Sequence, residues 1–125
     1  MLKPEPGLRV LIVDDNEEVI EVLCDGLTSF GHEVRSATNK KDALRVAREI
    51  CPQVAIIDIG LVGTDGWEIA EAIQALGLSP APRLLALTGY TEEVDRERSM
   101  QAGFERHLLK PVRMPKLDAI VRGRE

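Results

Sequence analysis

The sequence has little of what marks several common protein classes. Only two cysteines, Cys24 and Cys51, occur among 125 residues, too few for a disulfide framework or a zinc site in a domain of this length. No apolar run approaches the roughly 18 residues that a membrane-spanning helix needs, and the N-terminal MLKPEPG lacks the apolar segment of a signal peptide. We therefore expect a cytoplasmic protein with reduced thiols and no membrane contact.

Positive charge is also in deficit. Sixteen Lys and Arg stand against 21 Asp and Glu, which gives a formal net charge of -5. Domains that hold nucleic acid by general electrostatic attraction usually carry a basic excess, so we expect no direct nucleic-acid binding. The length is near the commonest size for one domain and predicts a single domain over residues 1–125.

Short apolar runs alternate with longer helical patterns along the chain. The clear runs are residues 10–13, 54–57 and 84–87, and weaker strand candidates are residues 33–37 and 104–109. Continuous apolar runs are typical of strands that are covered on both faces, as in a parallel sheet between helices. Five βα units with right-handed crossovers predict an α/β three-layer sandwich of flavodoxin type, with five helices and a five-stranded parallel sheet of order 2-1-3-4-5.

Local signals indicate where individual helices begin. Asn39, three residues before Asp42, resembles a capping box in which Asp replaces the usual Glu or Gln. Asp65 is interpreted as the cap of the helix that follows a glycine-rich loop. Residues 91–102 carry many charges and few apolar side chains, which predicts a loosely held helix of low local stability. His32 is interpreted as a surface residue.

Polar side chains stand at the carboxyl ends of four predicted strands. Asp14 and Asp15 follow the first strand, and Asp58 follows the third. Thr88 closes the fourth strand and Lys110 the fifth. Each residue alone has a bland explanation, because Asp is a good helix cap and Lys is usually solvated. Their joint placement predicts a site, since a doubly wound sheet binds ligands outside the strand ends where strand order reverses.

The predicted cluster of carboxylates favours a divalent cation and phosphoryl chemistry. Three neighbouring carboxylates repel one another, so either one stays protonated or a cation neutralises them. An all-oxygen set without Cys or His favours Mg²⁺ or Mn²⁺, and Mg²⁺ commonly completes its shell with water and phosphate oxygens. A carboxylate nucleophile, a metal, a Lys and a hydroxyl are the groups that phosphoryl transfer needs. The glycine-rich loop 60–66 lacks the spacing of a P-loop or a dinucleotide fingerprint, so we expect no nucleotide there.

Four motifs follow one another with one βα unit between neighbours. They are VDD at 13–15, IDIG at 57–60 with GTDG at 63–66, ALTGY at 86–90 and LKP at 109–111. Together they resemble the receiver domain of two-component response regulators over nearly the whole chain. The last two motifs are similar to those of receivers associated with hybrid sensor histidine kinases.

The resemblance implies a role for each matching acidic residue. Asp58 would be the phosphoacceptor. Asp15 would bind Mg²⁺ (or Mn²⁺) directly and Asp14 largely through water, with the backbone carbonyl of Gly60 as a further ligand. Asp58 would also contact the metal.

The resemblance also assigns the residues around the acceptor. Thr88 and Lys110 would contact the phosphoryl oxygens, and the Lys110–Pro111 peptide would be cis. Gly60 and Tyr90 would border the acceptor and tune the lifetime of the phosphorylated state.

Two positions depart from the family pattern. Val62 stands where Pro is common in the loop after the acceptor. His107 occupies the switch position at which Tyr or Phe is more frequent, and an imidazole there makes switching sensitive to pH. The resemblance implies that Thr88 moves inward on phosphorylation and that His107 turns with it, changing the face formed by the fourth helix, fifth strand and fifth helix.

The implied function is a phosphoacceptor signalling domain, not a turnover enzyme. Its partners would be a sensor histidine kinase or a histidine phosphotransfer domain, and a downstream protein on the switching face. One alternative is a receiver-like interaction module that is not phosphorylated, against which the complete set of site residues argues. Another is a small phosphatase with an Asp nucleophile, but such an enzyme needs a second acid two residues after the nucleophile, where Gly60 stands. The sequence leaves open whether the chain acts alone or within a longer protein.

Overall fold

Five strands and five helices alternate along the chain in the computed structural model, which describes residues 6–60, 65–89 and 96–124. The strands are β1 (Arg9–Val13), β2 (Glu33–Ala37), β3 (Val54–Asp58), β4 (Arg83–Thr88) and β5 (Phe104–Leu109). The helices are α1 (Glu17–Ser29), α2 (Lys40–Ile50), α3 (Gly66–Ala75), α4 (Arg96–Ala102) and α5 (Lys116–Val121). Among the described residues, none of these helices is long and apolar enough to cross a membrane.

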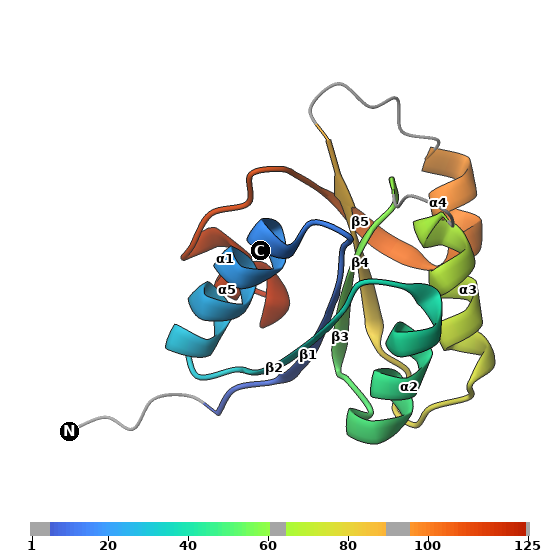
Figure 1. Ribbon diagram of the computed structural model, residues 1–125, viewed down its shortest axis with the longest axis horizontal. Helices are drawn as coiled ribbons and strands as arrows, with labels where there is room; N and C mark the ends of the chain where they lie inside the picture. The colour runs from blue at the N-terminus through green and yellow to red at the C-terminus, as the bar shows by residue number, and fades with distance from the viewer. Residues whose placement is uncertain (1–5, 61–64, 90–95, 125) are drawn as a thin grey trace.

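All strand pairs are parallel, and the strand order is β2-β1-β3-β4-β5. Helices α1 and α5 cover one face of the sheet, and α2, α3 and α4 cover the other (Figure 1). The predicted three-layer α/β fold and its strand order are confirmed. Strands β1 and β3 end at the same rim of the sheet. They are neighbours at the point where the strand order reverses.

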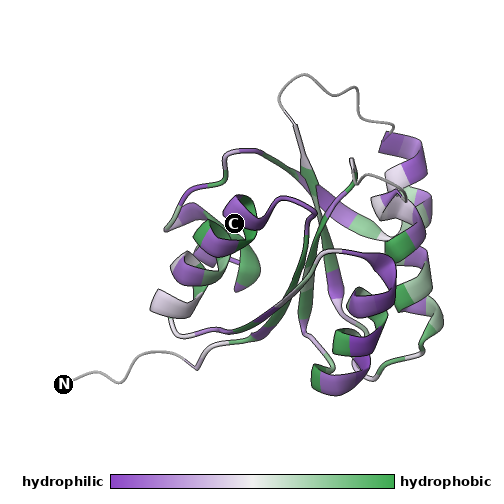
Figure 2. Cartoon of the chain, in the orientation of Figure 1, coloured by the Kyte–Doolittle hydropathy of each residue, from purple (hydrophilic) through white to green (hydrophobic). Residues whose placement is uncertain are grey.

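The sheet divides the interior into two apolar cores. Successive residues of a strand point to opposite faces, so in β1 Leu11 and Val13 join one core while Val10 and Ile12 join the other. Apolar colour concentrates on the central strands and on the sheet-facing sides of the helices (Figure 2). This two-sided burial explains why the central strands appear as continuous apolar runs in the sequence.

Side-chain caps begin three of the helices. Asn16 Oδ1 accepts from the backbone N–H of Glu18 at 2.9 Å at the start of α1. Asn39 Oδ1 accepts from Asp42 N at 2.8 Å before α2, and Asp65 Oδ1 accepts from Glu68 N at 2.6 Å before α3. The predicted caps at Asn39 and Asp65 are therefore present.

Helix α4 has few buried residues. It spans Arg96–Ala102, and only Ser99 and Ala102 are buried in it. Residues 90–95, at the start of the expected 91–102 helix, lie outside the described part of the chain. The small buried surface agrees with the expectation of a helix that is held by few contacts.

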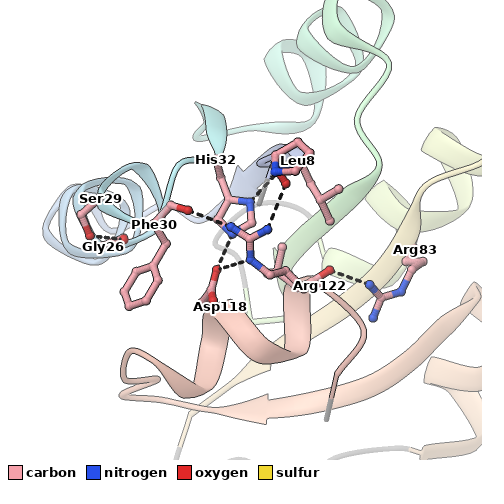
Figure 3. Close-up of polar contacts among 10 residues, drawn as sticks. Leu8, Gly26, Ser29, Phe30, His32, Arg83, Asp118 and Arg122 are labelled. Carbon is pink, nitrogen blue, oxygen red and sulfur yellow. Dashed lines mark hydrogen bonds and ion pairs between the residues drawn. The ribbon is translucent and has the colours of Figure 1, made fainter. Parts of the chain in front are cut away.

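The interpretation of His32 as a surface residue is wrong, because only 4% of this residue is exposed. Its Nδ1 accepts from the backbone N–H of Leu8 at 3.0 Å. The other ring nitrogen, Nε2, therefore carries the proton and donates to Asp118 Oδ1 on α5 at 2.7 Å (Figure 3). A residue of the α1–β2 connection is thus joined to α5 near the amino end of β2.

Arg122 completes this network at the amino ends of the strands. Its Nε donates to Asp118 Oδ1 at 2.9 Å, and its two terminal nitrogens donate to the backbone carbonyls of Pro6 and Phe30 at 2.9 and 2.8 Å (Figure 3). Asp118 therefore fixes a histidine and an arginine that together bind backbone groups of Pro6, Leu8 and Phe30.

We expect Asp118→Asn to lower the free energy of unfolding by about 2 kcal/mol at neutral pH, the size typical of lost charge-assisted hydrogen bonds. Burial raises the pKa of Asp118, but the hydrogen bonds from His32 and Arg122 outweigh it and hold the pKa below 3.8. A carboxyl group with a lowered pKa stabilises the fold above its unfolded value and stops doing so as the pH falls through its folded value. The difference between variant and wild type should therefore shrink at strongly acidic pH.

Urea denaturation at neutral and acidic pH measures this effect. Glu49→Gln is the matched control, because Glu49 accepts from two arginines, Arg35 and Arg45, on the exposed surface. The free energy of unfolding of Glu49→Gln should stay close to that of the wild type. An equal loss in both variants, or a deficit in Asp118→Asn that does not change with pH, would contradict the role given to Asp118.

Candidate functional site

The carboxyl ends of four strands bring together the acidic and basic residues that the sequence singled out. Asp14 and Asp15 follow β1, Asp58 is the last residue of β3, and Thr88 is the last of β4. Lys110 follows β5 directly. The side chains of Asp14, Asp15, Asp58 and Lys110 meet at this rim.

Two of the carboxylates are buried and held by backbone amides. Asp14 is fully buried, and its Oδ1 accepts from Asn16 N at 2.9 Å. Asp58 is 4% exposed, and its Oδ1 accepts from Gly60 N at 2.8 Å. In each case the residue two positions on turns back to bind the carboxylate, so the orientation of both side chains is fixed by the local chain.

Lys110 bridges the same two carboxylates. Its Nζ lies 2.8 Å from Asp58 Oδ2 and 2.9 Å from Asp14 Oδ2. The backbone N–H of Lys110 donates to the carbonyl of Thr88 at 2.9 Å, which anchors the lysine to the end of β4. Burial lowers the pKa of Lys110, but the two carboxylates outweigh burial and raise it above 10.5. The bridge therefore carries a full positive charge at neutral pH.

The charge of Asp14 is only partly compensated. Burial raises the pKa of its carboxyl, and repulsion by Asp58 adds to this, while the Asn16 amide and Lys110 offset only part of the rise. Asp14 Oδ2 is buried and accepts no well-directed hydrogen bond from the part of the chain that the structure describes, although Lys110 Nζ lies 2.9 Å away. A buried anionic oxygen in this position would be stabilised by a further positive charge.

The donor set fits a hard divalent cation. One carboxylate oxygen from each of Asp14, Asp15 and Asp58 lies within 4.8 Å of the others. Asp15 is exposed and Gly60 borders the cluster on its solvent side, so the group opens to water. Oxygen-only donors with a solvent-facing side suit Mg²⁺, which keeps several of its waters. The acidic cluster fits the metal site of a receiver domain.

Thr88 lies at the rim but is turned toward β5. The residue is 3% exposed, and its Oγ1 donates to the backbone carbonyl of Leu108 at 3.4 Å. The Lys110–Pro111 peptide is cis, as the resemblance implies. Tyr90 and Val62 lie outside the described residues.

His107 belongs to a hydrogen-bonded group that the sequence did not reveal. Its Nε2 lies 2.8 Å from Ser99 Oγ on α4, and that oxygen also accepts from Trp67 Nε1 on α3 at 2.8 Å. Burial lowers the pKa of His107, and the positive charge of Arg96 lowers it further. The three residues come from separate elements at unrelated sequence spacing, so no periodic signal links them.

Two grooves lie beside the site. One, of about 270 Å³, runs between α1 and the segment after β5, and its apolar lining includes Val19, Val22 and Val112 next to Lys110. Val22 is 67% exposed. The other, of about 370 Å³, lies between β5 and α5, and its charged or titratable lining residues are Arg106, His107, Arg113 and Lys116. Within the described ranges of the chain, no carboxylate lines this second groove.

Comparison with known sequences finds a matching family and similar proteins. A sequence model described as the response regulator receiver domain matches residues 10–122. The transcriptional regulatory protein PrrA of Mycobacterium tuberculosis is 33% identical over 115 residues, which cover 92% of this chain and 48% of PrrA. AfsQ1 of Streptomyces coelicolor, also a transcriptional regulatory protein, is 29% identical over 91% of this chain and 49% of its own length. The chain thus spans about half the length of these two curated relatives.

Solved structures of similar shape come from several organisms. A putative response regulator from Chloroflexus aurantiacus aligns with a TM-score of 0.83 and 29% identity, covering 94% of this chain and 96% of that one. The receiver domain of sensor histidine kinase PA1611 from Pseudomonas aeruginosa, described with a magnesium ion coordinated in its active-site cleft, aligns with a TM-score of 0.81 and 28% identity over 94% and 96% of the two chains. Chemotaxis protein CheY4 of Vibrio cholerae shares the fold, with a TM-score of 0.86 at 24% identity over 95% and 99%.

Proposed function

The chain belongs to the response regulator receiver domain family, and from this membership we propose that Asp58 accepts a phosphoryl group from a phosphohistidine with the help of Mg²⁺. The observation that carries the proposal is the buried group at the rim, in which Lys110 Nζ bridges Asp58 and Asp14 at 2.8 and 2.9 Å. A carboxylate so held has a fixed direction and lies beside a cation at the rim of the sheet. Receiver domains signal and do not act as turnover enzymes.

The transfer itself makes one bond and breaks one. A carboxylate oxygen of Asp58 attacks the phosphorus, and the P–N bond of the phosphohistidine breaks with its electron pair passing to the imidazole of the donor. Gly60 N holds Asp58 Oδ1 at 2.8 Å, so the attacking group needs no reorientation of its backbone. Lys110 Nζ, which bridges Asp58 and Asp14, would contact the phosphoryl oxygens and so place a positive charge where negative charge develops.

We assign the metal to the acidic cluster. Asp15 and Asp58 would hold Mg²⁺ directly and Asp14 largely through water, with the carbonyl of Gly60 as a further ligand. When bound, the ion neutralises the acceptor and the incoming phosphoryl oxygens together. The incompletely compensated Asp14 Oδ2 supports this assignment.

Phosphorylation would act on the output face through Thr88. To reach a phosphoryl oxygen, its hydroxyl must leave the carbonyl of Leu108, to which it donates at 3.4 Å. That change alters the contact between β4 and β5 beside His107, whose backbone is in register with Ala86. Gly60 and Tyr90 remain proposed determinants of the phosphorylated lifetime.

The two grooves suit two kinds of partner. A sensor histidine kinase or phosphotransfer domain must bring its phosphohistidine to Asp58, and the apolar groove beside the neighbouring Lys110 presents Val22 at 67% exposure. A downstream protein would bind the face of α4, β5 and α5, where the second groove carries Arg106, Arg113 and Lys116. We propose that residues 1–125 form one such receiver unit.

Intact-mass measurement tests the proposed function. We expect the wild type to gain one phosphoryl group from phosphoramidate or acetyl phosphate when Mg²⁺ is present, and Asp58→Asn to gain none. Asp65→Asn is the matched control, because this carboxylate caps α3 outside the acidic cluster and should not be needed for the reaction. Equal labelling of Asp58→Asn, or labelling that persists at the same rate after removal of Mg²⁺, would contradict the assignment. Failure with a phosphohistidine donor as well would favour an interaction module that is not phosphorylated.

A further inference from the structure

Ser99 is a fully buried polar residue on a helix with few buried residues. Its exposed fraction is 0%, and among the residues of α4 only Ala102 is buried with it. Its Oγ lies 2.8 Å from Trp67 Nε1 on α3 and 2.8 Å from His107 Nε2 on β5. One hydroxyl group therefore joins three elements on the same side of the sheet.

The chemistry of the three groups fixes the direction of one hydrogen bond, and the tautomer of His107 sets the direction of the other. The indole N–H of Trp67 can only donate, so Ser99 Oγ accepts from it. The hydroxyl proton of Ser99 is then available for His107 Nε2, which accepts when the ring is neutral and carries its proton on Nδ1. Burial and the charge of Arg96 lower the pKa of His107 and so favour the neutral ring. The chain runs from Trp67 through Ser99 to His107.

One end of this hydrogen-bonded chain lies beside the segment that presents the phosphoacceptor, and the other lies on β5 next to β4. Trp67 follows Gly66, whose backbone packs so tightly that a Cβ there would lie 2.4 Å from the carbonyl oxygen of Asp58. His107 lies opposite Ala86, two residues before Thr88 on β4. The hydrogen-bonded chain therefore joins α3, next to the end of β3, to β5 by a route that does not pass through Thr88.

We propose that Ser99 is a positioning residue that holds the His107 ring toward α4 and ties its orientation to Trp67 and α3. A turn of His107 away from α4 then removes the acceptor of a buried hydroxyl and loosens a helix with few other buried contacts. The trigger for that turn rests on the proposed function, whereas the hydrogen-bonded chain itself is a property of the unphosphorylated protein.

The composition of the chain makes the hydrogen bonds directly observable by NMR. It holds one tryptophan and two histidines, so Trp67 gives a single indole N–H signal and the rings of His32 and His107 are easily assigned. The contacts of His32 place its proton on Nε2, and the proposed hydrogen-bonded chain requires the proton of His107 to lie on Nδ1. His32 serves as an internal reference in every variant.

The test compares wild type, Ser99→Ala and Ser29→Ala above pH 7. Ser29 donates to Gly26 O on the exposed part of α1. Ser29→Ala is therefore the matched control, because it also removes one hydroxyl group from a helix. We expect Ser99→Ala to speed solvent exchange of the Trp67 indole N–H at least tenfold and to shift His107 away from the Nδ1–H tautomer, with His32 unchanged. Ser29→Ala should change neither signal. An Nε2–H tautomer of His107 in wild type, or unchanged indole exchange in Ser99→Ala, would overturn the proposal.

Beryllofluoride with Mg²⁺ separates this proposal from the function on which its trigger rests. In wild type we expect the Trp67 and His107 signals to change together on binding, and in Ser99→Ala we expect the Trp67 signal to stay fixed while beryllofluoride still binds. Binding without any change at Trp67 in wild type overturns the switching role of Ser99. Absence of beryllofluoride binding contradicts the proposed acceptor function instead, while the tautomer and exchange results continue to decide whether the hydrogen-bonded chain exists.

Discussion

Lys110→Met is expected to slow phosphoryl incorporation at Asp58 at least about 100-fold, the loss typical when one fixed electrostatic group is removed from a reacting site. It is also expected to lower the free energy of unfolding by about 3 kcal/mol. The side chain of Asp14 is 0% exposed and that of Asp58 is 6% exposed, and both lie within 3 Å of Lys110 Nζ. Removal of the lysine leaves two adjacent buried carboxylates with no bridging cation.

The expected stability loss lies at the lower end of the range for broken buried ion pairs. Such losses run from about 3 to 5 kcal/mol, and Lys110 itself is 26% exposed, so water screens part of its charge. Mg²⁺ should restore part of the lost stability, because bound ligand stabilises the folded state by mass action and replaces the missing positive charge. It should not restore the rate to the same degree, since the lysine is proposed to contact the phosphoryl group.

Lys40→Met is the matched control for this experiment. Lys40 Nζ pairs with Glu68 Oε1 at 2.9 Å, a distance similar to the Lys110 pairs, but both side chains are more than one-third exposed. Exposed pairs are worth about 1 kcal/mol or less. Urea denaturation with and without Mg²⁺, together with a time course of intact mass, makes the comparison. If Lys110→Met matched Lys40→Met in both measurements, the central role of Lys110 would be wrong.

The fold and the position of the site follow closely from sequence pattern. The apolar runs at 54–57 and 84–87 coincide with β3 and β4, because these strands are covered on both faces and admit almost no polar residue. The polar residue that ends such a run then has to lie at the rim of the sheet. That is why Asp14, Asp58 and Lys110 could be predicted to meet before their contacts were known.

The two histidines show what sequence pattern does not contain. Both sit in short polar stretches, yet His32 is buried against Asp118 and His107 is bound to Ser99. These partners are 86 and 8 residues away, on helices whose packing against the sheet sets the contact. Periodicity predicts which face of a helix or strand is buried. It does not predict which polar group of another element a side chain on that face will contact.

The same distinction applies to Thr88. Its place at the end of β4 was predictable from the apolar run before it, and the residue is 3% exposed. Its hydrogen bond to the carbonyl of Leu108 depends on the register between β4 and β5, which shifts between Leu84 and Leu85. Sequence pattern therefore does not predict the hydrogen bond that the Thr88 hydroxyl makes.

Gly66→Ala is expected to destabilise the protein by about 3 kcal/mol and to disturb the acceptor, although Ala is the better helix former. An added Cβ at Gly66 would lie 2.4 Å from the carbonyl oxygen of Asp58 and 2.6 Å from the Cα of Ile59. Both are backbone atoms of the segment that presents the phosphoacceptor, so relief of the clash must move α3 away from the end of β3. We expect a lower rate of phosphoryl incorporation and a shifted Asp58 amide signal in the NMR spectrum.

Gly26→Ala gives this prediction a control with the opposite sign. Gly26 lies inside α1, where an added Cβ would meet the Cε of Met114 at 2.8 Å, the far end of a flexible side chain that can move aside. The gain in helix propensity, up to about 1 kcal/mol, should then leave this variant as stable as wild type or more so. Urea denaturation and intact-mass labelling of both variants measure the contrast. Equal stabilities for the two variants would show that the close approach of α3 to Asp58 does not constrain the acceptor.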